Sequence, residues 1–218
     1  MKKDYVKRFI KVILSLAVYS LGNAFCVLAG DAGCNAWNTL TIGMSEFFGV
    51  RFGIANVCIS AVIIILDIIL KGKIGFGTIL NTLLIPIYSD IFIALLAFVP
   101  ESPNMFVGAL YAFIGQLFIG LAMVLYMRPG LGAGPRDTLM VVIGKRLKKL
   151  SIGTVKFIIE MCVLVVGFLI GGSIGLGTVV AIASQSFIFD IMCRLFKYDS
   201  RSQQNEDIFD TVRNLKNA

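Results

Sequence analysis

The sequence predicts an all-α membrane protein with six transmembrane helices, arranged as two inverted three-helix repeats that each carry an additional short helix. Of the 218 residues, 57% are hydrophobic and only 15% are charged, with a mean hydropathy of +0.87. A soluble domain of this length needs a larger polar surface. The apolar residues also gather into runs of bilayer-spanning length, about 20 residues at a 1.5 Å rise. Finally, the second half of the chain repeats the polar pattern of the first.

Six long apolar segments are the expected spans. They cover residues 9–29, 54–70, 75–99, 105–127, 153–170 and 174–195. The first span follows several basic residues but is longer than a usual signal-peptide core, so we expect it to be retained. Two shorter segments, 36–49 and 135–150, carry apolar residues at helical spacing. Because they are too short to cross a bilayer, they should lie at the interface or re-enter the membrane.

Basic residues predict the orientation of these spans. With the N-terminus in the cytoplasm and one crossing per long segment, 19 of the 20 Lys and Arg residues fall on the cytoplasmic side, and only Arg51 falls outside. Such a bias is typical of multi-pass membrane proteins. We therefore expect a protein of the inner (cytoplasmic) membrane, surrounded by the lipid bilayer, with both termini cytoplasmic.

An internal repeat divides the chain. Polar and glycine positions match at an offset of about 100 residues, in three places: 33–40 with 132–139, 71–78 with 171–178, and 90–91 with 190–191. A chance match in apolar sequence would mostly pair Leu with Val, whereas this one pairs Gly, Thr and Asp. Each unit crosses the bilayer three times, an odd number, so the second must be inverted relative to the first.

Three regions follow from this repeat. Residues 1–100 form the first three-helix repeat, 101–197 the second, inverted repeat, and 198–218 a polar cytoplasmic tail. We expect the tail to be a short, mobile extension. Its apolar residues could form one or two amphipathic turns: Ile208, Phe209, Val212 and Leu215.

The glycine-rich motifs resemble those of the YczE/YyaS/YitT family of bacterial integral membrane proteins. The similarity rests on Gly-Ala-Gly-Pro-Arg-Asp-Thr-Leu at 132–139, on Gly-Gly-Ser-Ile-Gly-Leu-Gly-Thr at 171–178 and on their first-half counterparts, and covers about residues 8–196. Members often carry Pro-Trp-Asp after the glycines, where this chain has Pro-Arg-Asp at 135–137 and Ala-Trp-Asn at 36–38. The resemblance implies the fold and a membrane location. It implies no settled activity and no soluble C-terminal domain of the YitT kind.

Several classes of function are disfavoured. The net charge of +7 arises from residues that flank apolar runs, without a basic helix carrying base-stacking aromatics, so we expect no nucleic-acid partner. Histidine is absent, and the five cysteines form no Cys-x-x-Cys pair. No HExxH, GxSxG or P-loop motif occurs. We therefore expect no enzymatic activity, no metal and no cofactor.

Glycines mark the backbone turns. Gly33, Gly132 and Gly134 precede the two short helices, and four more open two of the spans: Gly75, Gly77, Gly175 and Gly177. Small residues let helices approach closely in lipid. Backbone contact with a substrate or an ion is the alternative reading.

Polar residues at the starts of the short helices are candidate substrate ligands. The unpaired amides of a helix N-terminus, with Arg136 beside them, could receive an anionic group. Trp37, Asn38 and Asp137 complete this set. Alternatively, Asn38 and Asp137 are ordinary helix caps. Asp90, inside an apolar span, is a further candidate, unless a loop of the other repeat satisfies its carboxylate.

Glu160 is the candidate for proton coupling. It lies about 10 Å into the fifth span, where a carboxylate is costly unless it faces protein or water. Lys156 precedes it by one turn, so a structural ion pair is the alternative.

These features favour a secondary transporter or exporter of a small solute of unknown identity, with proton coupling left open and the binding site between the repeats. The alternative is a non-transporting membrane accessory or scaffold protein. Either could be a homo-oligomer.

Overall fold

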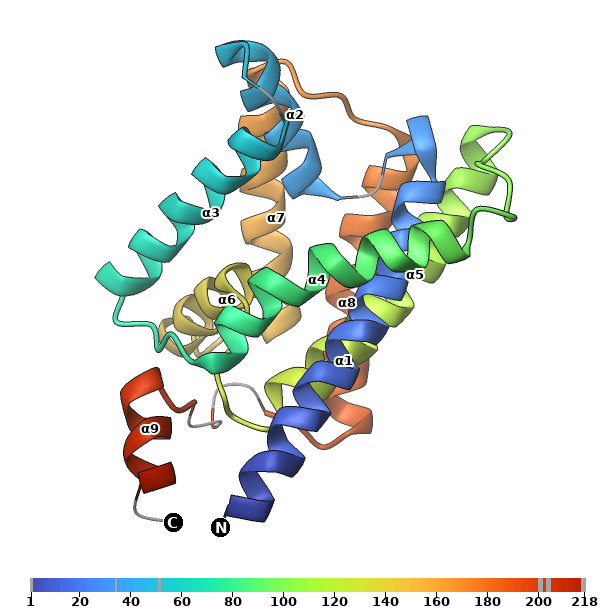
Figure 1. Cartoon of the computed structure of the whole chain (residues 1–218). Helices are drawn as coiled ribbons and strands as arrows, with labels where there is room; N and C mark the ends of the chain where they lie inside the picture. The colour runs from blue at the N-terminus through green and yellow to red at the C-terminus, as the bar shows by residue number, and fades with distance from the viewer. Residues whose placement is uncertain (1, 34, 51, 200–201, 203–204, 217–218) are drawn as a thin grey trace.

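A computed structural model of the chain describes residues 2–33, 35–50, 52–199, 202 and 205–216, and this part is helical without strands (Figure 1). The described residues form nine α-helices and one 3₁₀ turn. Their bounds are α1 Lys2–Leu28, η1 Gly30–Ala32, α2 Ala36–Phe48, α3 Phe52–Ile69, α4 Phe76–Leu95, α5 Met105–Met127, α6 Pro135–Arg146, α7 Ile152–Leu169, α8 Leu176–Leu195 and α9 Ile208–Lys216. The short helices α2 and α6 lie where the sequence predicts short segments.

Within the described residues, five helices are long and apolar enough to cross a membrane. These are α1, α4, α5, α7 and α8. The remaining predicted span corresponds to α3, whose apolar part, Ile54–Ile69, is shorter than in the other five. The all-helical class is confirmed, together with several candidate spans.

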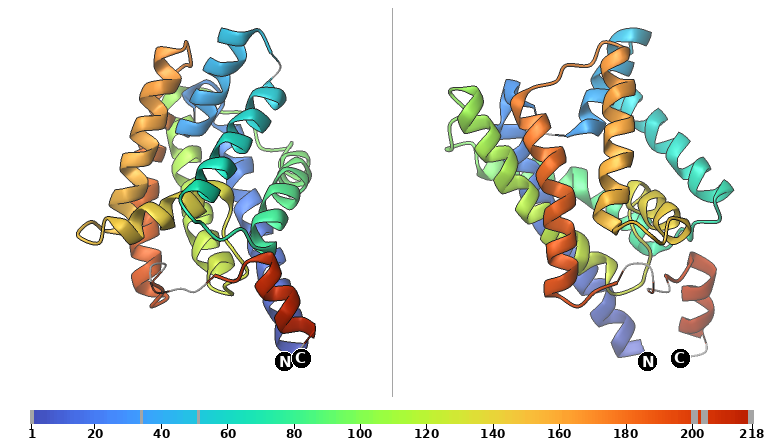
Figure 2. Two further views of the ribbon diagram at one scale, coloured as in Figure 1. Left: turned by 90° about the vertical axis from the view of Figure 1, so that its left-hand side faces the viewer. Right: turned by 180° about the vertical axis from the view of Figure 1, so that it is seen from behind.

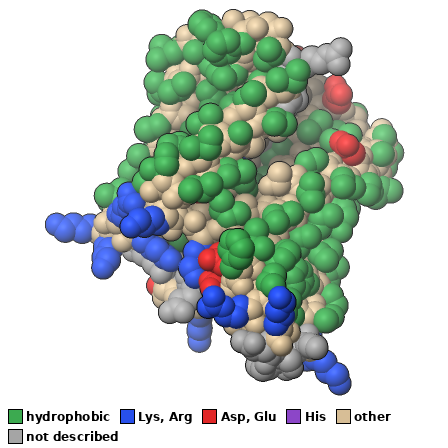
Figure 3. All heavy atoms as spheres, turned by 60° about the vertical axis from the view of Figure 1, so that its left-hand side comes forward, with side chains coloured by type: hydrophobic (Ala, Val, Ile, Leu, Met, Phe, Trp, Pro, Cys, Tyr) green, Lys and Arg blue, Asp and Glu red, His purple; other side chains and the backbone are tan. Residues whose placement is uncertain are grey.

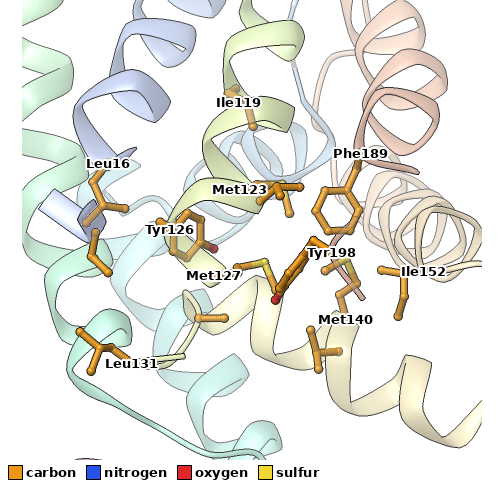
Figure 4. Close-up of a cluster of buried hydrophobic side chains, with 14 of the residues drawn as sticks. Leu16, Ile119, Met123, Tyr126, Met127, Leu131, Met140, Ile152, Phe189 and Tyr198 are labelled. Carbon is orange, nitrogen blue, oxygen red and sulfur yellow. The ribbon is translucent and has the colours of Figure 1, made fainter. Parts of the chain in front are cut away.

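The helices pack in two groups (Figures 1 and 2). One is a row in the order α4, α1, α5, α8. The other is a ring in which α2 contacts α3 and α7, and α6 also contacts α3 and α7. Contact between α7 and α8 joins the ring to the row. The largest apolar core surrounds α5 and takes residues from α1, α6 and α8; on its α6 and α8 side, Met123, Met127, Met140, Phe189 and Tyr198 gather (Figure 4).

A glycine-rich loop of each half packs on a helix of the other half. The two loops, residues 32–33 and 131–133, are called the exchanged loops below. A Cβ atom on Gly77 would meet the carbonyl oxygen of Gly132, and one on Gly177 would meet that of Gly33, both well inside van der Waals contact. The Gly77 amide donates to the Leu131 carbonyl at 2.7 Å. Each loop therefore packs backbone to backbone on the first turn of the other half's last long helix. This arrangement supports the reading of these glycines as residues of close packing.

Apolar side chains cover much of the surface, and basic ones gather at one end (Figure 3). Along α4, Leu83 is 59% exposed and Leu95 60% exposed, as expected of a helix that faces lipid. The basic end is also where both ends of the chain lie (Figure 2). Two cations counted with the cytoplasmic residues are instead enclosed by the helices: Lys156 is buried and Arg136 is partly buried.

The described part of the predicted tail is not free of the rest of the protein. The amphipathic turns form α9, and Glu206, shortly before it, contacts α1. Arg8 Nη1 lies 2.7 Å from Glu206 Oε1, and the Tyr5 hydroxyl donates to Glu206 Oε2 at 3.0 Å. Lys73 Nζ lies 2.7 Å from Asp210 Oδ2. This hydrogen bond raises the pKa of Lys73 and lowers that of Asp210.

Candidate functional site

The first turns of α2 and α6 meet inside the protein. Arg136, the second residue of α6, places its Cζ 4.7 Å from the centre of the Trp37 ring, and Trp37 is the second residue of α2. The two residues are matched positions in the sequence alignment of 33–40 with 132–139. Arg136 Nη2 also donates to Asn56 Oδ1 of α3 at 3.0 Å. A guanidinium over an indole face is an attractive arrangement, and more so when water is excluded.

Asp137 is buried beside this contact. The Tyr126 hydroxyl of α5 donates to Asp137 Oδ2, and the Gly134 amide donates to the Tyr126 oxygen at 3.3 Å. Asp137 lies in the first turn of α6, where the helix dipole stabilises a negative charge. The helix-cap alternative does not hold for either candidate, because Gly134 occupies the N-cap of α6 and Asn35 caps α2 through the Asn38 amide.

Lys156 and Glu160 form a buried ion pair on α7. Their Nζ and Oε1 atoms are 3.0 Å apart, and the side chains are only 9% and 4% exposed. The second carboxylate oxygen, Oε2, accepts no hydrogen bond from the described residues. The pair predicted from spacing is therefore present, and it leaves one buried acceptor free.

Tyr19 of α1 links these groups electrostatically. Its buried hydroxyl lies within electrostatic range of four charged side chains: Asp137, Lys156, Arg136 and Glu160. Its ring packs edge-on against Tyr126 with 6.4 Å between ring centres. Two cations and two anions thus share one buried region, which we call the polar cluster (Tyr19, Trp37, Asn56, Tyr126, Arg136, Asp137, Lys156 and Glu160). Its formal charges cancel, which lowers the cost of burying them.

An apolar cavity of about 630 Å³ lies within the ring of α2, α3, α6 and α7. Its walls are almost entirely hydrophobic, and Trp37 is one of them. Val155 and Ile159 also line it, and their neighbours in the sequence, Lys156 and Glu160, belong to the polar cluster. An apolar chamber with charged groups beside it suits a ligand that has both characters.

The structure brings together four of the six predicted site residues. Trp37, Arg136, Asp137 and Glu160 all belong to the polar cluster. Asn38 is exposed on α2, and Asp90 is exposed on α4. Asp190, the repeat counterpart of Asp90, instead accepts hydrogen bonds from the Gly153 amide at 2.8 Å and the Ser151 hydroxyl at 2.5 Å, at the start of α7.

The sequence analysis did not predict several residues of the polar cluster and its surroundings. Tyr19 and Tyr126 carry no signal of their own, because tyrosine is ordinary within or beside an apolar run. Asn56 did carry one, since it is the repeat counterpart of Lys156. Asp67 of α3 was also missed as a site residue: it is 1% exposed, and its Oδ1 accepts no hydrogen bond from the described residues.

No metal centre is evident in the part of the chain that the structure describes. There, no three His, Cys, Asp or Glu side chains are placed to hold a metal ion together.

Long apolar helices around a buried polar cluster define a helical membrane protein. The chain belongs to the family of unknown function DUF6198, whose model matches residues 6–194. It is 34% identical over 188 residues to an uncharacterized protein of Haemophilus influenzae, covering 84% of each chain. It is 26% identical over 181 residues to the uncharacterized membrane protein YczE of Bacillus subtilis, covering 82% of each.

A third relative is the uncharacterized protein YyaS of Bacillus subtilis. It is 28% identical over 173 residues, which cover 78% of this chain and 84% of that one. No solved structure matches the chain. The predicted resemblance to YczE and YyaS is confirmed, and the resemblance to YitT stays a prediction.

Proposed function

We propose that the protein is a secondary transporter or exporter of a small solute in the bacterial inner membrane, with its binding site between the two halves of the chain. The observation that carries this proposal is the contact between Trp37 and Arg136. Equivalent residues of two repeats can touch each other only close to the axis that relates the repeats. In transporters built from inverted repeats, substrate sites lie at this interface, beside the N-termini of short or broken helices.

We infer that α1–α4 and α5–α8 are inverted repeats. Each half contains three long helices and one short one, in the same order. The exchanged loops support the relation, because Gly77 meets Gly132 as Gly177 meets Gly33. Central helices α1 and α5 cross with Gly22 and Gly115 facing each other. If α3 spans the bilayer, each half crosses it three times and the halves are oppositely oriented.

Within this site, Arg136 would bind an acceptor group of the solute and Glu160 would carry a proton. One carboxylate oxygen of Glu160 is held by Lys156 and the other is free of hydrogen bonds from the described residues. A proton on Oε2 would neutralise Glu160 and release Lys156 from its partner. Protonation would thereby change the charge of the polar cluster, which is how coupling to a solute could arise.

Purified protein in liposomes that contain a trapped pH dye tests the proposal. Solutes from a broad metabolite and drug panel are added outside, and proton movement is recorded. We expect a subset of solutes to drive proton flux in the wild type and in Glu101→Gln, whose carboxylate is on an exposed turn. The flux should vanish in Glu160→Gln. A response that persists in Glu160→Gln would remove Glu160 from the coupling step.

A non-transporting accessory role draws on a different observation. A cavity of about 430 Å³ at the basic end is lined by Lys71, Lys73, Lys145 and Arg146. Such a surface suits an acidic partner. A stoichiometric partner whose binding requires these cations, together with liposomes inactive toward the whole panel, would favour this role over transport.

A further inference from the structure

The apolar cavity and Arg136 together define a kind of ligand. The cavity of about 630 Å³ falls within the range of pockets that hold small organic molecules, about 300–1,000 Å³. Its lining offers almost no polar group. A strongly hydrated solute would lose its water shell there without compensation. The main body of any molecule that fills this space is therefore apolar.

A positive charge lies beside the cavity, on Arg136, which does not line the cavity itself but contacts the lining residue Trp37. Arg136 stacks on Trp37 and gives one hydrogen bond to the neutral Asn56. The salt bridges between described residues do not include Arg136. A guanidinium has five N–H donors, and its planar fork suits a two-oxygen anion. Arg136 can thus accept an anionic group without losing an existing ion pair.

Each carboxylate of the polar cluster already has one partner, although Glu160 Oε2 accepts no hydrogen bond from the described residues. Glu160 is paired with Lys156, and Asp137 accepts from Tyr126 at the dipole-favoured start of α6. A cationic ligand would have to compete with Lys156 for Glu160. An anion at Arg136 would displace no salt bridge between described residues, whereas a cation at Glu160 would, and this difference favours an anion.

We propose that this cavity binds an amphipathic organic anion, with its apolar body between α2, α3, α6 and α7 and a single carboxylate or sulfonate group on Arg136. The inference rests on the proposed function only in taking this ligand to be the transported solute; binding can be tested without transport. A phospholipid acyl chain is the other occupant that an apolar cavity could hold. It would fill the space without needing Arg136.

Two native thiols report on the cavity directly. Cys58 on α3 and Cys162 on α7 both line it, and both are free and exposed. Cys193 on α8 is also free but is not part of the lining, so it serves as an internal reference. A bound ligand should shield the first two thiols from alkylation and leave the third unaffected.

The experiment measures N-ethylmaleimide alkylation of each cysteine by mass spectrometry, with the protein in lipid nanodiscs. The probes are decanesulfonate, decyltrimethylammonium and methanesulfonate, each below its micelle-forming concentration. At ten times its dissociation constant, decanesulfonate should slow alkylation of Cys58 and Cys162 by about tenfold, because occupancy follows mass action. The cation with the same chain and the anion without a chain should not protect.

Matched variants distinguish the effect of the Arg136 charge from the effect of the shape of the cavity. Arg136→Gln should abolish protection by decanesulfonate, whereas Arg194→Gln, an exposed arginine on α8, should retain it. Should Arg136→Gln fail to fold, Val62→Phe provides the second test, because Val62 lines the cavity and is already 56% exposed. Val62→Phe should reduce protection, and Ile65→Phe, 55% exposed on the same helix but outside the lining, should not.

Three results would overturn the inference. Equal protection by the sulfonate and the ammonium would indicate a purely apolar site, of the kind a lipid chain fills. Full protection of the thiols by decanesulfonate in Arg136→Gln would show that Arg136 does not bind the anionic group. Thiols that never react in ligand-free protein would show a cavity closed to water-borne solutes.

The outcome is separable from the transport proposal. If decanesulfonate protects the two thiols but no solute drives proton flux, the binding site is supported and the transport proposal is contradicted. If other solutes drive a flux that depends on Glu160 while the thiols stay unprotected, transport is supported and the proposed ligand class is contradicted.

Discussion

Single charged residues in an apolar setting determine much of this protein's chemistry. Lys156 and Glu160 are almost fully buried and paired at 3.0 Å. Removing two charges from water costs several kcal/mol each, and their attraction offsets the cost only when both are present. A single substitution in this pair therefore leaves one buried charge without its partner.

Lys156→Met should destabilise the folded protein by about 3–5 kcal/mol, because it leaves the Glu160 carboxylate buried without its partner. The double variant Lys156→Met/Glu160→Met should recover most of that loss. Thermal unfolding in detergent measures both effects. Lys73→Met, which breaks an exposed pair, is the control and should change stability little. Strictly additive losses in the double variant would show that the pair is not coupled.

The residues of the site were predictable to the extent that they interrupt an apolar pattern. Arg136, Asp137 and Glu160 stand out in the sequence for this reason, and all three lie in the polar cluster. Asn38 was predicted from its neighbours, but the residue after buried Trp37 turns about 100° around the helix and faces outward. Asp90 was predicted from its span, yet α4 packs chiefly on α1 and leaves that side chain exposed.

At the scale of elements, the glycine turns set how closely helices approach. The first turns of α4 and α8 each lie against a carbonyl oxygen of the other half's loop. A methyl group at these positions must displace backbone, which cannot yield as a side chain tip can.

Gly77→Ala and Gly177→Ala should each lower stability by about 1–3 kcal/mol through overpacking. Gly144→Ala in α6 is the matched control, because its added methyl would meet only the terminal carbon of Ile152. Alanine also favours a helix over glycine, so this variant should be neutral or slightly stabilising. Unfolding midpoints in one detergent compare all three. A similar loss in the control would attribute the effect to something other than the exchanged loops.

Helix α9 depends on two ion pairs of different burial. Glu206 and Arg8 are 19% and 26% exposed, whereas Asp210 and Lys73 are 38% and 52% exposed. Arg8→Gln should therefore accelerate amide hydrogen exchange in α9 several-fold, and Lys73→Gln should do so less. The reverse order of effects would show that α9 is held mainly through Asp210.

The contact between Lys73 and Asp210 should persist over a wide pH range. Its hydrogen bond lowers the pKa of Asp210, so the carboxylate loses its charge only as the pH falls through that lowered value. It raises the pKa of Lys73, so the ammonium loses its charge only as the pH rises through that raised value. Amide exchange of α9, corrected for intrinsic rates, should therefore be constant near neutral pH and increase only toward either extreme. A transition near neutrality would mean that another group controls the docking of α9.

At the scale of the whole molecule, composition predicted the helical membrane class but not the arrangement of the helices, and the orientation stays a prediction. The five long apolar helices and the two short ones could be read from the apolar runs. The division into a row and a ring could not, because it depends on which apolar faces pair, and lipid-facing and protein-facing residues have the same composition here. The cavity inside the ring is a product of that division.

Orientation can be tested with C-terminal fusions. We expect green fluorescent protein at the C-terminus to fluoresce, because the basic end should be cytoplasmic, and alkaline phosphatase there to be inactive. Phosphatase inserted in the turn between α4 and α5 should be active. The opposite pattern at both sites would place the basic end outside.

The exchanged loops also bear on how the chain is made. Residues are synthesised in order, so the start of α4 stays uncovered until residues 131–133 have left the ribosome. The loop at 32–33 has no packing partner until α8, the last long helix, has been synthesised. The first half therefore cannot complete its backbone packing during its own synthesis, and we expect the nascent protein to stay accessible to membrane proteases until translation is nearly finished. A fragment of residues 1–100 should accordingly be degraded when expressed alone and persist when residues 101–218 are supplied in the same cell; its stable accumulation alone would show that the first half needs no such cover.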